Sequence, residues 1–285
     1  MTDVVRTRPA PPRREPVAGG ASVGGALFAL ATRDLGDRRA LRWPLLLDLA
    51  FGVVNLLVYL FISRVVAPTR GHPALASGSY FDFVAMGIVF MLVIQAGASH
   101  VTKRVAREQR SGTLEMLVAQ PLPRSTLAVG LAVHPLLFAM ARALVYLSLL
   151  TAFFHLDVGR ADWWGVAVVL TLSCAAVMGV GIMLAALGVA VGRGEIIASL
   201  VTVGLAFMSG TYFPVSALPG PLPDLTAVLP TRIALDGLRA AVAGESWAGS
   251  AGALLLSAAL LLPLSCWAFG QALRIGARRG ILTRE

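Results

Sequence analysis

Nucleotide chemistry depends on a lysine in a fixed setting, and this chain has one lysine, Lys103, flanked by Thr102 and Arg104. A P-loop has the spacing Gly-x-x-x-x-Gly-Lys-Ser/Thr, because backbone amides and one lysine together hold the phosphates. The residues around Lys103 do not have this spacing. We therefore expect this chain to bind no cofactor, and any ATP and magnesium to belong to a separate subunit.

Side chains for hydrolytic, redox or metal chemistry are scattered along the chain. No Gly-x-Ser-x-Gly, His-Glu-x-x-His or Cys-x-x-Cys motif occurs. Cys174 and Cys266 both lie in apolar runs and are interpreted as small buried hydrophobes. The histidines lack the spacing of metal ligands: His72, His100, His134 and His155. We predict no catalytic residue and no metal site, so the chain is not expected to be an enzyme.

The polar stretch over residues 101–126 holds a short amphipathic pattern. Leu114 and Leu117 share one face of a short helix, and Glu115 lies on the other. Pro121 limits the continuation of that helix. Such a helix can dock into a groove on a soluble partner, or it can rest on lipid headgroups. The pattern alone leaves both interpretations open.

A few polar residues interrupt the apolar runs. Asp48 and Asn55 are seven residues apart and share a helical face, and Gln95 lies in the next run. Arg142 lies near the middle of a later run, where a charge costs about 2.5–3.5 kcal/mol to insert. We expect Arg142 to pair with Asp48 or Asp82 and hold helices together. The alternative is that these polar residues lie along a substrate route.

Composition identifies the setting of these residues. The chain is 57% hydrophobic and 14% charged, with a mean hydropathy of +0.77, whereas a soluble domain is about 25% charged. Several apolar runs exceed the roughly 18 residues of a transmembrane candidate. The fold class is therefore an all-α integral membrane protein with six predicted spans: about 44–66, 80–100, 127–154, 163–191, 196–213 and 247–273.

The remaining segments flank or interrupt this six-span domain, residues 44–273. Prolines in residues 1–21 indicate a disordered cytoplasmic tail. Apolar and charged residues over 22–43 predict an amphipathic helix on the membrane interface. Residues 214–246 are rich in proline yet apolar, which predicts two short re-entrant helices. Residues 274–285 form a basic cytoplasmic tail.

The basic residues indicate the orientation. With the N-terminus in the cytoplasm, 18 Lys and Arg residues lie on the cytoplasmic side and four lie outside. Positive charge favours the cytoplasmic side, so both termini are predicted to be cytoplasmic in a multi-pass protein of the bacterial cytoplasmic membrane. The net charge of +9 reflects this topology, and we expect no nucleic-acid partner.

Two motifs carry a resemblance to a known family. Residues 108–117 read EQRSGTLEML and are followed by Pro121, and residues 209–214 read SGTYFP. Three further pieces follow in order, residues 218–219, 229–230 and 236–239, which read LP, LP and DGLR. In order and spacing they resemble ABC transporter permeases of the type-2 exporter family, over nearly the whole chain.

The resemblance implies roles for particular residues. The loop after the second span would hold a coupling helix that presses on a separate ATPase, through Glu108, Arg110, Gly112, Thr113, Leu114, Glu115, Leu117 and Pro121. The re-entrant segment would cap the pathway, through Phe213, Pro214, Pro219, Pro230 and Arg239. The working unit would join two permeases, as a homodimer in membrane lipid, with two ATPase copies.

The predicted function is the permease subunit of an ATP-driven exporter. Short outer loops and an apolar pathway favour an amphipathic or lipid-like substrate such as a drug, an antibiotic or a lipid-linked product. The alternatives are polysaccharide export and a membrane scaffold or assembly subunit that does not transport. An ion-driven transporter is disfavoured, because Asp48 and Asp82 lie near span ends and no inverted repeat is evident.

Overall fold

The computed structural model describes residues 52–62, 80–120, 123–153, 159–192, 194–217 and 219–279, together with Gly25 and Ala50. The regular structure in these ranges is entirely helical, as predicted. Its elements are α3 (Tyr80–Gln95), a π-helical turn (Ala96–His100), α4 (Val101–Arg110), α5 (Thr113–Val118), α6 (Arg124–Phe153), α7 (Trp163–Val191), α8 (Gly194–Met208), a 3₁₀ turn (Val215–Ala217), α9 (Leu222–Thr226), α10 (Pro230–Ala243) and α11 (Ala248–Arg279).

Four helices in the described part are long and apolar enough to cross a membrane: Tyr80–Arg110, Arg124–Phe153, Trp163–Val191 and Ala248–Ala277. Two shorter apolar helices cover Gly52–Ile62 and Gly194–Met208. The chain is thus a multi-pass helical membrane protein, and the count of six spans stays a prediction. The predicted tail over 1–21, most of the predicted interfacial helix over 22–43 and Asp48 lie outside the described residues.

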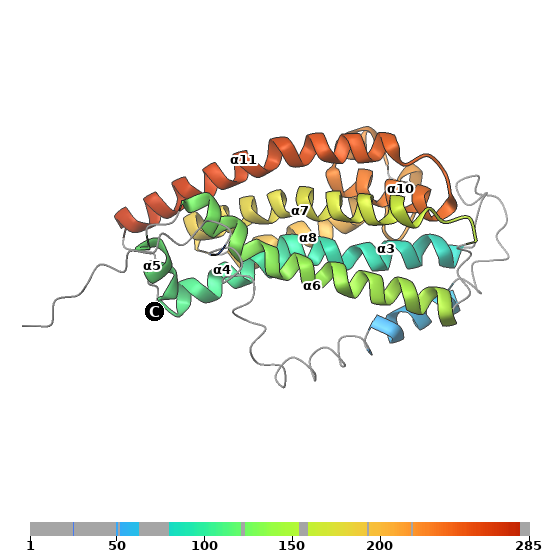
Figure 1. The fold of residues 1–285 in the computed structure, drawn as a ribbon, viewed down its shortest axis with the longest axis horizontal. Coiled ribbons are helices and arrows are strands. Elements are labelled where there is room, and N and C mark those ends of the chain that lie inside the picture. Colours follow the sequence, from blue (N-terminus) through green and yellow to red (C-terminus); the bar gives the residue numbers. More distant parts are fainter. Residues whose placement is uncertain are drawn as a thin grey trace, which may run out of the picture.

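The long helices lie side by side in an elongated bundle (Figure 1). At one end of the bundle lie α4, α5 and the C-terminal end of α11, and α10 lies at the other end. The outer surface of α11 is apolar and exposed, at Leu255, Leu256, Leu260, Leu264 and Trp267. In a membrane protein such a surface faces lipid, because lipid tails solvate apolar side chains as well as a core does.

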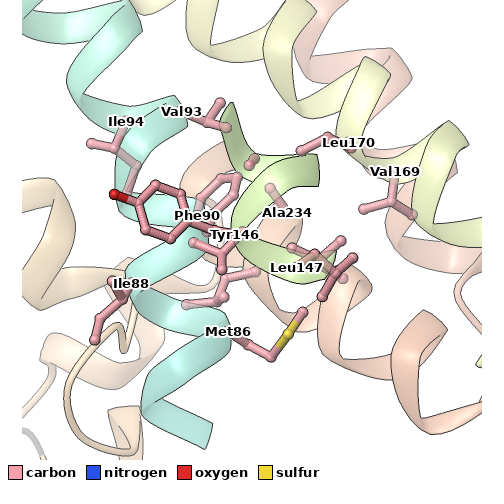
Figure 2. Packing of buried hydrophobic residues seen from close by; sticks show 14 of the residues in the cluster. Met86, Ile88, Phe90, Val93, Ile94, Tyr146, Leu147, Val169, Leu170 and Ala234 are labelled. Atoms are coloured by element: carbon pink, nitrogen blue, oxygen red, sulfur yellow. The ribbon is translucent and has the colours of Figure 1, made fainter. Parts of the chain in front are cut away.

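The core joins α3, α6, α7 and α10. Phe90 of α3 and Tyr146 of α6 are almost fully buried there, beside Val169 of α7 and Ala234 of α10 (Figure 2). These four elements come from distant parts of the sequence. Their packing therefore brings segments that are far apart in the sequence into one core.

Glycines permit the closest approach in the bundle. A Cβ atom at Gly181 of α7 would lie 2.1 Å from the carbonyl oxygen of Gly97 in the π-helical turn. Since no side chain fits into that space, the two backbones are held in direct contact, as small residues allow in membrane helix pairs.

Three helix ends differ from the predicted span ends. The helix that begins at Tyr80 continues past His100 to Arg110, and α11 continues past Leu273 to Arg279. Arginine, lysine, glutamate and glutamine are good helix formers, so charge ends the membrane segment without ending the helix. In contrast, α8 ends at Met208 rather than near residue 213, because Gly210 adopts a φ of 75° that no α-helix continues through.

Candidate coupling site

The turn between α4 and α5 is defined by short-range hydrogen bonds. The Ser111 hydroxyl donates to the carbonyl oxygen of Arg107 at 3.0 Å, and the Thr113 hydroxyl donates to the Glu108 carboxylate. Between them Gly112 has a φ of 70°, a left-handed conformation that glycine adopts without strain. The predicted coupling residues Glu108, Gly112 and Thr113 therefore shape the turn that aims α5, and Glu108 is buried.

The apolar face of α5 packs inside this chain. Leu114 is fully buried, in a cluster with Val105 of α4, Leu127 of α6 and Val189 of α7. Leu117 is partly buried against the same cluster. The apolar face of α5, which the sequence analysis considered for docking into a partner's groove, thus attaches α5 to the bundle. Leu114 is not accessible at the surface. Pro121, another predicted coupling residue, lies outside the described residues.

The outer face of α5 carries Glu115, which the sequence analysis placed there, and Met116, which it missed. Glu115 is exposed, and 72% of the neighbouring Met116 is exposed. Methionine is flexible and polarizable, which suits a contact with another protein. The available signal was an apolar residue at position 116, on the helical face opposite Leu114.

A second connection links α4 to α8. The Arg110 guanidinium forms an ion pair with Glu195 in the first turn of α8. Both side chains are exposed, so the pair contributes little stability, about 0–1 kcal/mol. Its consequence is positional, because it places the end of α4 against the turn between α7 and α8. A cavity of about 400 Å³ lies between α4 and that turn, and its lining residues include Thr102, Gln109 and Gly188.

The predicted polar residues of the spans are spread over three helices. Asn55 is half-buried on the helix over Gly52–Ile62, and Gln95 is the half-buried last residue of α3. Arg142 is half-buried on α6, and its Cζ atom lies 5.9 Å from the ring centroid of Phe138. Pairing of Arg142 with an acid stays a prediction, as does a substrate route.

The predicted cap lies at the opposite end of the bundle. Arg239 of α10 donates from Nη2 to the carbonyl oxygens of Phe83 and Gly210, each at 2.9 Å. Pro230 is the first residue of α10, a position where proline's missing N–H costs no helical hydrogen bond. Two further predicted cap residues differ in exposure: Phe213 is half-buried, with its ring centroid 5.8 Å from that of Phe207, and Pro219 is exposed. Pro214, the remaining predicted cap residue, is half-buried.

Asp162 is another residue that the sequence reasoning missed. Its carboxylate caps α7 by accepting from the backbone amides of Trp164 and Gly165, each at 3.1 Å. It also accepts from the Trp247 indole Nε1 at 2.7 Å, just before α11. These hydrogen bonds, led by the one from Trp247, lower the pKa of Asp162 below its ordinary value. The start of α7 and the start of α11 are therefore held together.

Among the described residues, no three His, Cys, Asp or Glu side chains gather closely enough to hold a metal ion. The long apolar helices and the exposed apolar surfaces together define the class, a multi-pass helical membrane protein. Comparison with known families agrees. The sequence model of the ABC-2 type transporter family matches residues 28–243.

The chain therefore belongs to the ABC-2 type transporter family. A search of curated proteins found no match. Family membership makes this chain the transmembrane permease part of an ABC transporter, whose partner is an ABC ATPase.

Proposed function

We propose that this chain is the permease subunit of an ATP-driven exporter and that α5 is its contact with the ATPase. The observation that most supports this proposal is the way in which α5 is attached to the bundle. Buried Leu114 fixes the helix to the bundle, while Glu115 and Met116 face outward. A short helix held this firmly can transmit a push instead of yielding to it.

A movement of α5 would be transmitted along the helices next to it. The helix from Tyr80 to Arg110 spans 31 residues, about 46 Å at 1.5 Å per residue. It contains one π-helical turn, Ala96–His100, a type of irregularity that is frequent at functional sites. The Arg110–Glu195 ion pair extends the same path to α8. Movement of α5 would thus reach both α3 and α8.

The orientation supports the same assignment. Lys103, Arg104, Arg107 and Arg110 all lie on α4, beside α5. Because positive charge favours the cytoplasmic side, this end of the bundle faces the cytoplasm, where an ATPase would dock. The protein would then reside in a bacterial cytoplasmic membrane with both termini inside, as two permease copies with two ATPase copies.

We further propose an amphipathic or lipid-like cargo, such as a drug, an antibiotic or a lipid-linked product. The connection between α6 and α7 at the outer end spans only residues 154–162, and apolar residues dominate the bundle. Such an apolar bundle offers few of the polar groups that would hold a long hydrophilic chain. Polysaccharide export is the competing cargo class, and a scaffold without transport is the competing role.

Transport by reconstituted protein tests the proposal. The chain and its partner ABC ATPase would be placed in inverted membrane vesicles with a fluorescent lipid, a lipophilic dye or a labelled polysaccharide. ATP-dependent uptake of the lipid or the dye is expected. Uptake of polysaccharide alone would reassign the cargo. ATP hydrolysis without movement of any probe would favour the scaffold role.

A further inference from the structure

Three basic side chains line one side of α4. Lys103, Arg107 and Arg110 are exposed, whereas Val101 and Val105 on the opposite face are buried. The three basic residues, with Ser111 and Glu195, line an open cavity of about 480 Å³. The cavity is therefore strongly basic, because Glu195 is the only acid among these lining residues.

An apolar strip begins beside this cavity. Arg110 and Glu195 also line the cavity of about 400 Å³ between α4 and the α7–α8 turn, and Ile196 lies on its rim. Leu200 and Val203 follow Ile196 on the same face of α8. The exposed fractions of these three side chains are 62%, 70% and 52%. A molecule in the basic cavity could thus extend an apolar chain along α8.

The position of the cavity along the Tyr80–Arg110 helix corresponds to the level of the lipid headgroups. The helix runs without a break from Tyr80 to Arg110. At 1.5 Å per residue, Lys103 lies about 35 Å along it from Tyr80, and Arg107 about 40 Å. The hydrocarbon core is about 30 Å thick and the bilayer with its headgroups about 40–45 Å. Measured from Tyr80 at the outer edge of the hydrocarbon core, both side chains therefore lie beyond its inner edge, with Lys103 among the lipid headgroups and Arg107 at their border with water.

The basic side chains that line the cavity differ in their ion pairs. Arg110 is paired with Glu195. In the part of the chain that the structure describes, no ion pair involves the side chain of Lys103 or Arg107. Two cations one helical turn apart thus face a cavity at headgroup depth, beside an apolar strip. A phosphodiester with an attached acyl chain satisfies both features.

We propose that this place is a binding site for an anionic phospholipid. Lys103 and Arg107 would hold its phosphate, and one acyl chain would lie along Ile196, Leu200 and Val203. The site rests on the proposed orientation only for the choice of leaflet, which is the cytoplasmic one. A lipid bound there bridges α4 and α8 next to the α5 turn, so membrane composition would influence how firmly the coupling helix is held.

The test uses the full-length chain purified in a neutral detergent. Phosphatidylglycerol, phosphatidylcholine and inorganic phosphate are each titrated while the melting temperature and the lipid retained in native mass spectrometry are measured. Phosphatidylglycerol alone should raise the melting temperature and remain bound. K103Q/R107Q should bind it about 30-fold more weakly, the loss expected for two surface cations. R160Q/R274Q removes two exposed charges elsewhere and should bind like the wild type.

A second variant separates a lipid from a free anion. I196N/L200N changes two exposed side chains and keeps all the basic residues. It should weaken phosphatidylglycerol binding. Equal stabilisation by phosphatidylcholine, or unchanged phosphatidylglycerol binding by K103Q/R107Q, would refute the site. Equal stabilisation by inorganic phosphate would also overturn the proposal and assign the cavity to a free anion. Failure of the transport experiment would leave this binding measurement unaffected.

Discussion

The Cζ atom of Arg239 lies 3.6 Å from the centroid of the Phe83 ring, and Nη2 of the same arginine donates to the Phe83 carbonyl oxygen at 2.9 Å. Another hydrogen bond from Nη2 reaches the carbonyl oxygen of Gly210. One side chain of α10 therefore joins the first turn of α3 to the segment after α8. Hydrogen bonds from a charged donor are among the stronger ones, at about 1.5–3 kcal/mol.

This relationship predicts a large effect of Arg239→Met on stability. The variant retains an apolar stem but leaves two carbonyl oxygens without their charged donor, so the melting temperature should fall by about 5–10 °C. Thermal unfolding of the full-length chain in detergent measures it. Arg160→Met, at an exposed arginine, serves as the matched control and should melt like the wild type. Equal melting of both variants would show that Arg239 does not hold the cap.

Opposite faces of α5 should respond differently to the same substitution. Met116→Asp changes a side chain that is 72% exposed, so the protein should fold and lose ATP-driven transport. Leu114→Asp buries a charge and should lose folding instead. Yield after size-exclusion chromatography and transport in vesicles distinguish the two results. Val228→Asp, 79% exposed at the other end, is the control for a new surface charge. Normal transport by Met116→Asp would remove this face from the ATPase contact.

The contact between Gly97 and Gly181 predicts a steric effect. A Cβ at Gly181 would lie 2.1 Å from the Gly97 carbonyl oxygen, so Gly181→Ala should separate α7 from the π-helical turn and lower the melting temperature. Gly204→Ala on α8 meets open space and should raise stability by up to about 1 kcal/mol, because alanine favours the helix. A Gly181→Ala protein as stable as the wild type would contradict the close packing.

The low pKa of Asp162 predicts a pH dependence. Because hydrogen bonds from Trp247 and from two backbone amides favour the charged carboxylate, its contribution to stability is present above its ordinary pKa of 3.8. That contribution is lost as the pH falls through the lowered pKa of the folded protein. Asp162→Asn should therefore melt below the wild type at pH 7, and the difference should shrink towards pH 3. Asp224→Asn, at an exposed acid of α9, is the control. A difference that is constant with pH would mean that ionisation of Asp162 is not involved.

Local features of the sequence were enough to predict the four helices that are long and apolar enough to cross a membrane. The structure has α7 over Trp163–Val191, the range predicted from its apolar run. Such a run identifies a span because each residue in it must be soluble in lipid, whatever its neighbours are. The family resemblance also rested on local motifs, and the family match over residues 28–243 confirmed it.

Contacts between distant residues could be decided only by the tertiary structure. The hydrophobic pattern of α5 showed two faces, but burial of Leu114 against α6 and α7 determined which face remains for a partner. Arg239 was predicted as a cap residue, yet its acceptor Phe83 lies 156 positions away. Asp162 and Trp247 are 85 positions apart and carry no signal of their pairing. The periodicity of apolar residues predicts which face of a single helix is apolar, whereas these pairings depend on how separate helices pack.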